Sequence, residues 1–406
     1  MINKVTELKL KVRNKGYSGE VSRKLLKELV SLNGRIGFRG YTKNDIVERS
    51  NGVLTYSPTN IVNNKIVNYK NDTYISQDKY KESPEIMVKN NDILFVKTGS
   101  TLGKSALVRN LTEPATINPQ LIVIKTIHVD SDYLAVYLLT DSIQKQVFQV
   151  KIGGAVPTLT ETEIGKFVVK LPPLPEQTAI GSLFRTLDDL LASYKDNLTN
   201  YQSLKVTMLS KMFPKVGQTV PEIRLDGFEG EWENKILSEV TNITMGQSPK
   251  SENYTDNPND YILVQGNADI KDKQVVPRLW TTEVTKMAEI GDIILTVRAP
   301  VGDIGKTDYN VVIGRGVAAI KGNDFIFYTL EKMKMTGFWN KFSTGSTFES
   351  ISSNDIKEAI IQIPTLEEQK AIGAYFSNLD NLIVAHQEKI SQLETLKKKL
   401  LQDMFI

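Results

Sequence analysis

The sequence contains no cysteine and only two histidines, His128 and His386, so it offers no disulfide and few of the usual zinc ligands. It also lacks an apolar run of 18 residues and an N-terminal signal pattern, so we expect a cytoplasmic protein without a membrane span. No G-x-G-x-x-G opens a βα unit, no G-x-S-x-G elbow occurs, and no carboxylate cluster has metal-ligand spacing. These absences predict a chain that catalyses no reaction and binds no metal.

Two strings come close to catalytic motifs without meeting their requirements. Residues 99–105, Gly-Ser-Thr-Leu-Gly-Lys-Ser, have three residues between the glycines where a phosphate-binding loop needs four. Residues 118–121, Asn-Pro-Gln-Leu, and residues 171–174, Leu-Pro-Pro-Leu, both fail the Asn/Asp-Pro-Pro-aromatic pattern of an adenine methyltransferase. We therefore expect neither nucleotide hydrolysis nor methyl transfer by this chain.

What the sequence does contain is a long internal repeat. Residues 171–191 read LPPLPEQTAIGSLFRTLDDLL, and residues 363–383 read IPTLEEQKAIGAYFSNLDNLI, at a constant offset of 192 residues. The match continues without a gap to Met212-Phe213 and Met404-Phe405. An agreement of this length indicates an internal duplication.

Both copies have the pattern of a single long helix. Apolar residues recur at alternating steps of four and three, which is typical of a coiled-coil seam. The seam residues are Ile180, Phe184, Leu187, Leu191 and Leu198 in the first copy, and Ile372, Phe376, Leu379, Ile383 and Ile390 in the second. Roughly 38 residues at 1.5 Å each would make a rod of about 57 Å. The alternative is a pair of ordinary core helices, although these average only about 11–12 residues.

The entrance of each helix carries its own signal. In the second copy Thr365 precedes Glu368 by three residues, the spacing of a capping box. In the first copy prolines at positions 172, 173 and 175 suit a helix start, and Pro214 ends the same helix. His386 stands in the seam, so we expect it to pack against the partner helix rather than bind a metal.

Mixed segments flank the repeats and predict compact domains. Residues 54–56, 92–96 and 121–124 have the pattern of strands, and residues 133–139 that of a short helix. The two mixed segments are weak repeats of each other, with Asp92-Ile93-Leu94 matching Asp292-Ile293-Ile294 and a following Gly-Lys at 103–104 and 305–306. The predicted segments are an N-terminal arm (1–20), a first variable domain (21–165), a central repeated helix (166–213), a connector (214–232), a second variable domain (233–362) and a C-terminal repeated helix (363–406).

This order predicts an α/β (α+β) fold in which two variable domains alternate with two long helices. Such a duplication favours pseudo-two-fold symmetry, with the helices antiparallel and holding the domains apart. The net charge is +3 overall, but residues 1–170 carry +9 and residues 214–362 carry −5. A basic region of this size is compatible with phosphate contact, and solvated surface charge explains it nearly as well.

The repeated helix entrance, Pro-x-Leu-x-Glu-Gln-x-x-Ile, identifies a family resemblance. It begins at Pro172 and again at Pro364, and the second variable domain opens with Gly-Phe-x-Gly-x-Trp at residues 227–232. This arrangement resembles the DNA specificity (S) subunit of type I restriction–modification systems. The resemblance covers the chain beyond the first twenty residues. No Gly-Phe-x-Gly-x-Trp entrance precedes the first variable domain, which is a departure from the pattern.

The resemblance implies a non-catalytic reader of double-stranded DNA. Each variable domain would be a target recognition domain for one half of a bipartite, asymmetric site, and the helices would dock two modification (methyltransferase) subunits. Those subunits would hold S-adenosylmethionine, and two restriction subunits would use ATP and Mg, so that this chain binds no cofactor itself. Two other functions stay open at this point: a coiled-coil adaptor, or a regulatory module without direct DNA readout.

The resemblance also directs the choice of candidate DNA contacts toward polar and basic loop residues. Arg and Lys suit guanine edges or phosphates, and Asn and Gln suit adenine. The candidates are Arg35, Arg39, Lys43, Asn60, Lys97 and Lys104 in the first domain, and Gln247, Gln265, Asn267, Arg298, Lys306 and Arg315 in the second.

Overall fold

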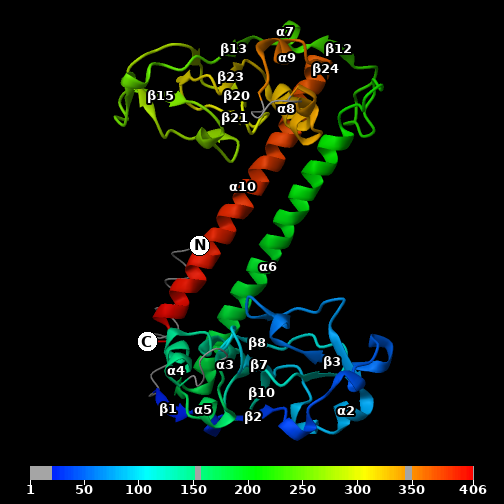
Figure 1. Cartoon of the computed structure of the whole chain (residues 1–406), viewed down its shortest axis with the longest axis vertical. Coiled ribbons are helices and arrows are strands. Elements are labelled where there is room, and N and C mark those ends of the chain that lie inside the picture. Colours follow the sequence, from blue (N-terminus) through cyan, green and yellow to red (C-terminus); the bar gives the residue numbers. More distant parts are fainter. Residues whose placement is uncertain (1–20, 151–156, 343–349, 406) are drawn as a thin grey trace. The chain divides into compact units, whose positions relative to one another are not determined.

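A computed structural model describes residues 21–150, 157–342 and 350–405, so the predicted arm at 1–20 lies outside the described residues. The chain divides into two compact units. Unit 1 contains residues up to 195 together with 389–406, and unit 2 contains residues 196–388. The boundaries fall inside the two long helices, so each helix contributes one end to each unit (Figure 1).

The predicted repeated helices are confirmed. Helix α6 spans Leu174–Lys211 and helix α10 spans Leu366–Asp403, each with 38 residues. The identical glutamines of the repeat close both entrances, because Gln177 Nε2 donates to Pro172 O at 2.8 Å and Gln369 Nε2 donates to Pro364 O at 3.0 Å. These bonds satisfy carbonyls that precede the helix, so they fix the angle at which the chain enters it.

The capping box is confirmed in one half only. Thr365 Oγ1 accepts from the Glu368 amide at 3.4 Å, as expected. The Glu368 carboxylate instead accepts two bonds from Arg224, at 2.8 and 2.7 Å, and is buried. The connector that contains Arg224 is thereby tied to the start of α10 by a bidentate charged pair, which is the stronger kind of hydrogen bond.

The predicted boundary between the first domain and its helix needs correction. Residues 168–171 form strand β11, which pairs antiparallel with β1, Ser22–Leu25. The helix begins only at Leu174, because Pro172 and Pro173 have no amide to donate and separate the strand from the helix. Unit 2 repeats the arrangement, with β12 (Glu233–Ile236) paired to β24 (Ile360–Ile363) just before α10.

Unit 1 is built from small sheets and short helices. The four-stranded sheet has the order β2-β10-β7-β8, and the three-stranded sheet has the order β6-β3-β9. The strands are β2 (Val30–Gly34), β3 (Gly52–Tyr56), β4 (Ile61–Val62), β5 (Lys65–Ile66), β6 (Thr73–Ser76), β7 (Ile93–Val96), β8 (Ser105–Leu107), β9 (Ala115–Ile117) and β10 (Leu121–Thr126). The α-helices are α2 (Gln77–Lys81), α3 (Ser131–Tyr137), α4 (Asp141–Val150) and α5 (Glu161–Gly165). All three predicted strands and the predicted short helix are therefore confirmed, with every end within two residues of its predicted position.

Unit 2 repeats this plan with larger sheets. The six-stranded sheet has the order β13-β23-β20-β21-β17-β16, and the five-stranded sheet has the order β14-β18-β15-β22-β19. The strands are β13 (Ile243–Met245), β14 (Tyr254–Thr255), β15 (Tyr261–Val264), β16 (Ile270–Lys271), β17 (Gln274–Val275), β18 (Trp280–Thr281), β19 (Met287–Ala288), β20 (Ile293–Thr296), β21 (Ile304–Lys306), β22 (Val311–Ile313) and β23 (Val317–Ile320). The α-helices are α7 (Leu237–Val240), α8 (Asp324–Met335) and α9 (Ser353–Lys357).

An aromatic cluster closes the core of each unit around both long helices. In unit 1, Phe184 of α6 lies 6.0 Å from Phe405, which follows α10, and Phe405 lies 5.7 Å from Tyr133 of α3. In unit 2 the residues 192 positions away repeat the contact. Phe376 of α10 lies 6.1 Å from Phe213, which follows α6, and Phe213 stacks on Phe325 of α8 at 5.5 Å. Each core therefore contains one phenylalanine from within a long helix and a second from just beyond the C-terminal end of the other long helix.

The helices run antiparallel within each unit. In unit 1, Lys397 pairs with Asp188 and Lys195 lies 2.6 Å from Glu394, so rising numbers in α6 meet falling numbers in α10. In unit 2, Tyr201 contacts His386 at 5.1 Å between ring centroids, and Lys205 lies 2.6 Å from Asp380. The packed histidine is thus confirmed.

The residues of the predicted seam fall into two groups, one buried in the domain cores and one only half-buried. Ile180, Phe184, Leu187, Ile372, Phe376 and Leu379 are buried, and they belong to the domain cores rather than to contacts between the helices alone. Leu198, Ile383 and Ile390 are only half-buried. A pair of helices cannot by itself cover all the apolar residues of such a seam. The domain helices α3 and α8 cover the seam residues that belong to the domain cores.

No helix within the described residues combines the length and the apolar character that crossing a bilayer demands.

Candidate nucleic-acid interface

Each unit contains a pair of parallel strands whose carboxyl ends lie side by side and lead into exposed loops. In unit 1, β3 and β9 are parallel, with Tyr56 opposite Ile117 at their carboxyl ends. In unit 2, β15 and β22 are parallel, with Val264 opposite Ile313. Loops that follow neighbouring parallel strands meet at one sheet edge, which is a frequent place for ligand binding.

The same backbone hydrogen bonds hold these loops in both units. The Asn118 amide donates to Tyr56 O at 2.8 Å, and the Gly314 amide donates to Val264 O at 2.8 Å. The Lys97 amide donates to Gln120 O at 2.9 Å, and the Val297 amide donates to Gly316 O at 2.9 Å. The loops at 118–120 and 314–316 are therefore equivalent, although their side chains differ completely.

In unit 2 three loops converge so closely that only glycine fits where they touch. We name residues 246–248, 265–267 and 314–316 loop cluster 2. A Cβ on Gly246 would lie 2.1 Å from Gly314 O, and a Cβ on Gly316 would lie 2.0 Å from Gln265 O. The Gln247 amide donates to Ile313 O at 2.8 Å, and the Arg315 amide donates to Ser248 Oγ at 3.1 Å. The exposed side chains of Gln247, Asn267 and Arg315 thus project from one rigid base.

In unit 1 the loops equivalent to 265–267 and 314–316, together with the turn between β7 and β8, surround a hollow of ≈ 450 Å³. We name residues 57–60, 98–104 and 118–120 loop cluster 1. The hollow is lined by hydroxyl, amide and ammonium groups, contributed by Ser57, Thr59, Thr98, Ser100, Thr101, Lys104 and Gln120. Gln120 and Lys104 are exposed, whereas Asn118 is buried and accepts the Gln120 amide at 3.0 Å. Loop cluster 1 therefore presents donors and acceptors to solvent on an ordered support.

Four of the six predicted contacts in the second domain lie at or beside this edge. Gln247, Gln265, Asn267 and Arg315 are in loop cluster 2, and Gln265 Nε2 donates to Tyr254 OH at 2.6 Å. Arg298 is exposed in the turn after β20. Lys306 lies elsewhere, because its ammonium pairs with Asp324 of α8 and stands over the Phe327 ring at 5.5 Å.

In the first domain the structure separates exposed candidates from supporting ones. Lys104 lines the hollow, and Lys43 is exposed in the turn Lys43–Asp45. Asn60 is buried and holds the loop, donating to Val67 O at 2.9 Å and to Asp72 at 2.8 Å. Arg39 lies 3.5 Å from Glu85. Contact of these residues with DNA stays a prediction.

Arg35 and Lys97 are also used inside the unit. Arg35 is buried, and its Nε donates to Ile117 O at 3.0 Å at the end of β9. Burial lowers the pKa of this guanidinium, and the charge of nearby Tyr41 opposes that effect. Lys97 lies 2.7 Å from Glu161; burial by itself would raise the pKa of Glu161, but the bond from Lys97 leaves that pKa lowered. Arg35 therefore holds the end of the strand that leads into residues 118–120, whereas the Lys97 ammonium pairs with helix α5.

The sequence reasoning missed Gln120 and the hydroxyl residues of loop cluster 1. In the sequence, residues 118–121 resemble only an incomplete methyltransferase motif, and the parallel pairing of β3 with β9 leaves no local pattern. The matching of Gly103-Lys104 with Gly305-Lys306 also needs correction. Gly103 and Gly302 share a φ of +86° in equivalent turns, whereas Gly305 and Lys306 lie inside strand β21. The glycine that closes the turn, rather than the Gly-Lys pair, is the feature that repeats.

The turn at 99–104 connects two antiparallel strands, β7 and β8, with Phe95 opposite Ser105. A phosphate-binding loop would lead from a strand into a helix, so the strand that follows agrees with the rejection of that motif. Within the described residues, no three His, Cys, Asp or Glu side chains come together as a metal site would require.

Comparison with known proteins identifies the family. The family model described as "Type I restriction modification DNA specificity domain" matches residues 24–202 and again residues 229–395. The chain belongs to this family. Its two matches coincide with the two copies of the duplicated plan. Members of the family are specificity subunits, which are not catalytic, and the same holds for this chain.

Individual relatives agree with this assignment. A Methanocaldococcus jannaschii protein with the name "Putative type I restriction enzyme MjaX specificity subunit" is 28% identical over 344 residues, covering 81% of this chain and 80% of the relative. A chain from a solved structure on complex assembly and conformational transition of the type I R-M system is 25% identical, with a TM-score of 0.53 and coverage of 95% and 97%. The S subunit from M. genitalium has a TM-score of 0.61 at 14% identity, covering 96% of this chain and 97% of that one, and it supports the fold alone.

The glycines of loop cluster 2 provide a stability test in this specificity subunit. Gly316→Ala should lower the free energy of unfolding by at least about 2 kcal/mol, because the new methyl group meets a backbone oxygen that cannot move aside. Gly266→Ala, in the adjacent loop, should change it by less than about 0.5 kcal/mol, since nothing lies within 4 Å of the added Cβ. Chemical denaturation of both variants measures the difference. Equal effects would contradict the close contact of these loops.

Proposed function

We propose that each unit reads one half of a bipartite DNA site through its loop cluster. The proposal rests on a contrast between the backbone that holds the loops, which is the same in both units, and the exposed side chains of the loops, which differ. Equivalent backbone bonds hold the loops at the carboxyl ends of parallel strands in both units, while the exposed side chains differ. A duplicated support with divergent side chains is what reading two different half-sites requires.

The two loop clusters suit different contacts with a duplex. In loop cluster 2, Arg315 has the donors to bond a guanine edge, and Gln247 and Gln265 have the donor–acceptor pairs that match adenine. In loop cluster 1, Gln120 is the exposed amide and Lys104 the exposed cation. A lysine on a loop suits a phosphate, which sets register and affinity without reading sequence. We assign base reading to the amides and Arg315, and phosphate contact to Lys104.

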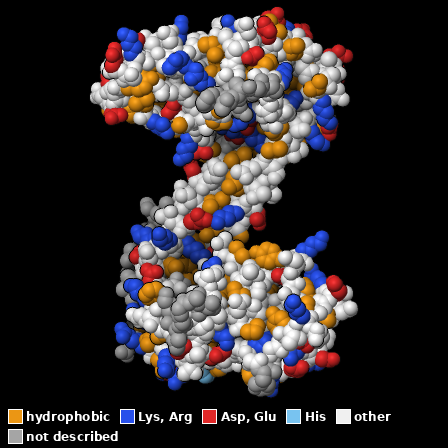
Figure 2. Space-filling model, viewed as in Figure 1, with side chains coloured by type: hydrophobic (Ala, Val, Ile, Leu, Met, Phe, Trp, Pro, Cys, Tyr) orange, Lys and Arg blue, Asp and Glu red, His pale blue; other side chains and the backbone are white. Residues whose placement is uncertain are grey.

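We further propose that the chain docks two modification subunits on equivalent apolar surfaces. Three pairs of large apolar side chains are exposed at the same positions of both copies, namely Val168 and Ile360, Leu174 and Leu366, and Leu190 and Leu382. Hydrophobic side chains are visible at the surface of the long helices (Figure 2). An exposed leucine that is the same in both copies of a duplication favours a surface that one kind of partner covers twice.

In this proposal the chemistry belongs to the partners. The modification subunits hold S-adenosylmethionine, and two restriction subunits, which use ATP and Mg, complete the complex. The specificity subunit contributes sequence recognition and the docking surface, and it binds none of these cofactors.

Lys104→Ala and Gln120→Ala should separate phosphate contact from base reading. With the modification subunit present, Lys104→Ala should weaken binding to all duplexes and reduce the slope of log K against log salt by about 0.9. Gln120→Ala should leave the slope unchanged and cost about 1–3 kcal/mol only on the preferred half-site. Binding titrations at several salt concentrations measure both. If neither variant alters DNA binding, loop cluster 1 is not the reading surface.

Charged substitutions at the duplicated leucines should test docking. Leu174 is 57% exposed and Leu366 is 53% exposed, so either can be replaced by Asp with little strain on the fold. Leu174→Asp or Leu366→Asp alone should remove one modification subunit from the complex, and the double variant should remove both. Each loss should weaken that site at least about tenfold, because a leucine side chain loses its burial. Native mass measurement of the complexes gives the stoichiometry.

Val206→Asp provides the matched control for docking. Val206 is 56% exposed on the same helix α6, but Lys398 stands at its equivalent position, so this apolar site is not duplicated. The variant should retain two modification subunits. Loss of a subunit from Val206→Asp, or full occupancy in the double leucine variant, would contradict the proposed surface.

A further inference from the structure

A lysine occupies a backbone position in unit 2 that suits asparagine or glycine. Strands β16 and β17 are joined by a two-residue turn, in which Asp272 has a φ of 49° and Lys273 a φ of 64°. The equivalent turn of unit 1, between β4 and β5, has Asn63 and Asn64 at φ values of 50° and 60°. Left-handed turns of this kind favour Asn, Asp and Gly. A long side chain in such a conformation persists where contacts around it compensate for the strain.

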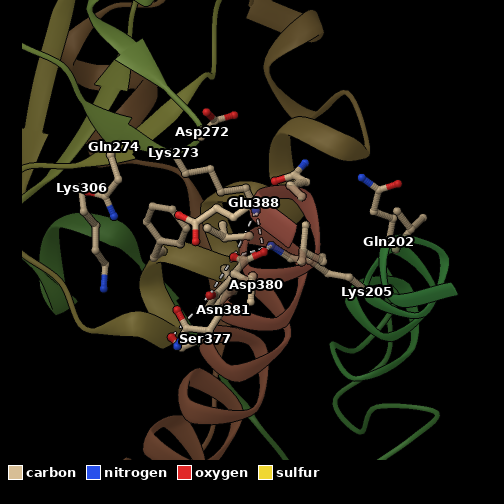
Figure 3. Close-up of a pocket in the computed structure, with 17 residues that line it drawn as sticks. Gln202, Lys205, Asp272, Lys273, Gln274, Lys306, Ser377, Asp380, Asn381 and Glu388 are labelled. Carbon is tan, nitrogen blue, oxygen red and sulfur yellow. Dashed lines mark hydrogen bonds and ion pairs between the residues drawn. The ribbon is translucent and has the colours of Figure 1, made fainter. Parts of the chain in front are cut away.

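The compensating contacts of Lys273 reach two helices. Its Nζ lies 2.6 Å from Glu331 Oε1 of α8 and 3.2 Å from Asp380 Oδ2 of α10. Asp380 also accepts two bonds from Lys205 of α6, at 2.6 and 2.7 Å, and one from Tyr328 OH of α8, at 3.0 Å. Figure 3 shows Lys205 and Lys273 reaching Asp380 from different elements. One carboxylate therefore connects the hairpin to both long helices.

The network is partly buried and its charges balance. Lys205 is buried, and Glu331 also lies 2.9 Å from its Nζ, so two cations face two anions. Burial lowers the pKa of Lys205, and Glu331 only partly offsets that effect. Burial likewise acts to lower the pKa of Lys273, but Glu331 and Asp380 outweigh it and raise that pKa. A hollow of ≈ 720 Å³ adjoins the network, and the hairpin is also held to β21, because the Lys306 amide donates to Lys273 O at 2.9 Å.

Unit 1 has only the helix-to-helix half of this network. Asp188 pairs with Lys397, at the positions equivalent to Asp380 and Lys205. Val136 and Leu139 replace Tyr328 and Glu331, and the structure describes no hydrogen bond from the Asn64 side chain to either long helix. A hollow of ≈ 630 Å³, lined by Asn64, Asp188 and Lys397 among others, occupies this place. The hairpin attachment is therefore a property of unit 2 within the described residues.

The hairpin continues directly from loop cluster 2. Strand β16 begins at Ile270, immediately after Asp269. Asp269 is buried, and its Oδ2 accepts from the backbone amides of Gln265 at 2.7 Å and Gly266 at 3.2 Å. A shift of the hairpin relative to the long helices therefore moves Gln265 with it.

We propose that Lys273 and Asp380 are positioning residues, which fix loop cluster 2 to the two long helices and so restrict the spacer length that the specificity subunit accepts. This inference rests on the proposed reading of two half-sites. Neither residue contacts DNA in this account, so their loss should alter tolerance to spacing without altering which bases are preferred.

The test uses the full chain with its modification subunit on a DNA library. The library contains the methylated site with its native spacer and with spacers one base pair longer and shorter. Lys273→Asn introduces the residue that unit 1 has at this turn, so the hairpin should fold and the melting temperature should stay within a few degrees. Methylation of the altered spacers, relative to the native spacer, should rise about fivefold, a change within the range of coupling in charged networks. Base preferences in both half-sites should be unchanged.

Two further variants make the result specific. Asp188→Asn breaks the equivalent helix-to-helix pair of unit 1 without affecting a hairpin, and it should leave spacer tolerance at the wild-type level. Asp380→Asn should widen tolerance, and adding Lys273→Asn to it should produce less than the sum of the two separate effects, because the two residues share one ion pair. Wild-type tolerance in Lys273→Asn and Asp380→Asn, or equal widening by Asp188→Asn, would overturn the inference. A wild-type complex that methylates no specific site would instead contradict the proposed function.

Discussion

The core of each unit depends on a phenylalanine that lies just beyond the C-terminal end of one long helix and packs on the other long helix. Phe405 follows α10 and packs on Phe184 of α6 in unit 1, and Phe213 follows α6 and packs on Phe376 of α10 in unit 2. These side chains are buried among apolar residues of the domain helices α3 and α8. Truncating such a phenylalanine to alanine typically costs about 3–5 kcal/mol. The stability of both domains is therefore tied to the integrity of both helices.

This constraint explains how a duplicated chain can diverge at its surfaces. The aromatic closures, the glutamines at the helix entrances and the ion pairs Asp188–Lys397 and Lys205–Asp380 recur at an offset of 192 residues. The exposed side chains of the loops at the carboxyl ends of the parallel strands, such as Gln120 and Arg315, have no such restriction, because backbone bonds hold these loops. Asn118-Pro119-Gln120 and Gly314-Arg315-Gly316 occupy equivalent places. A fixed frame with variable loops is suited to recognising different sequences with the same partners.

The long helices were predictable from the sequence because their pattern extends over many turns and occurs twice. The strands at 54–56, 92–96 and 121–124 were predictable as well, since they are short apolar runs with turn signals at their ends. The pairing of β3 with β9 was not, because parallel pairing joins segments about sixty residues apart and leaves no local pattern. The sequence therefore indicates only some of the residues that the structure brings together in the loop clusters. Residue type predicts Lys306 and Arg35 as DNA contacts, but it does not indicate that Asp324 pairs with Lys306 or that Arg35 bonds the end of β9.

Exchange of a single domain tests the central claim most directly. Residues 22–171, bounded by the paired strands β1 and β11, can be replaced by the corresponding domain of a related specificity subunit, with the aromatic residue at position 133 retained. The methylated sites are then mapped by sequencing DNA from cells that contain the chimera and the modification subunit. We expect one half of the methylated site to change and the other half to stay as it was. A change in both halves, or in neither, would contradict the account in which each unit reads its own half-site.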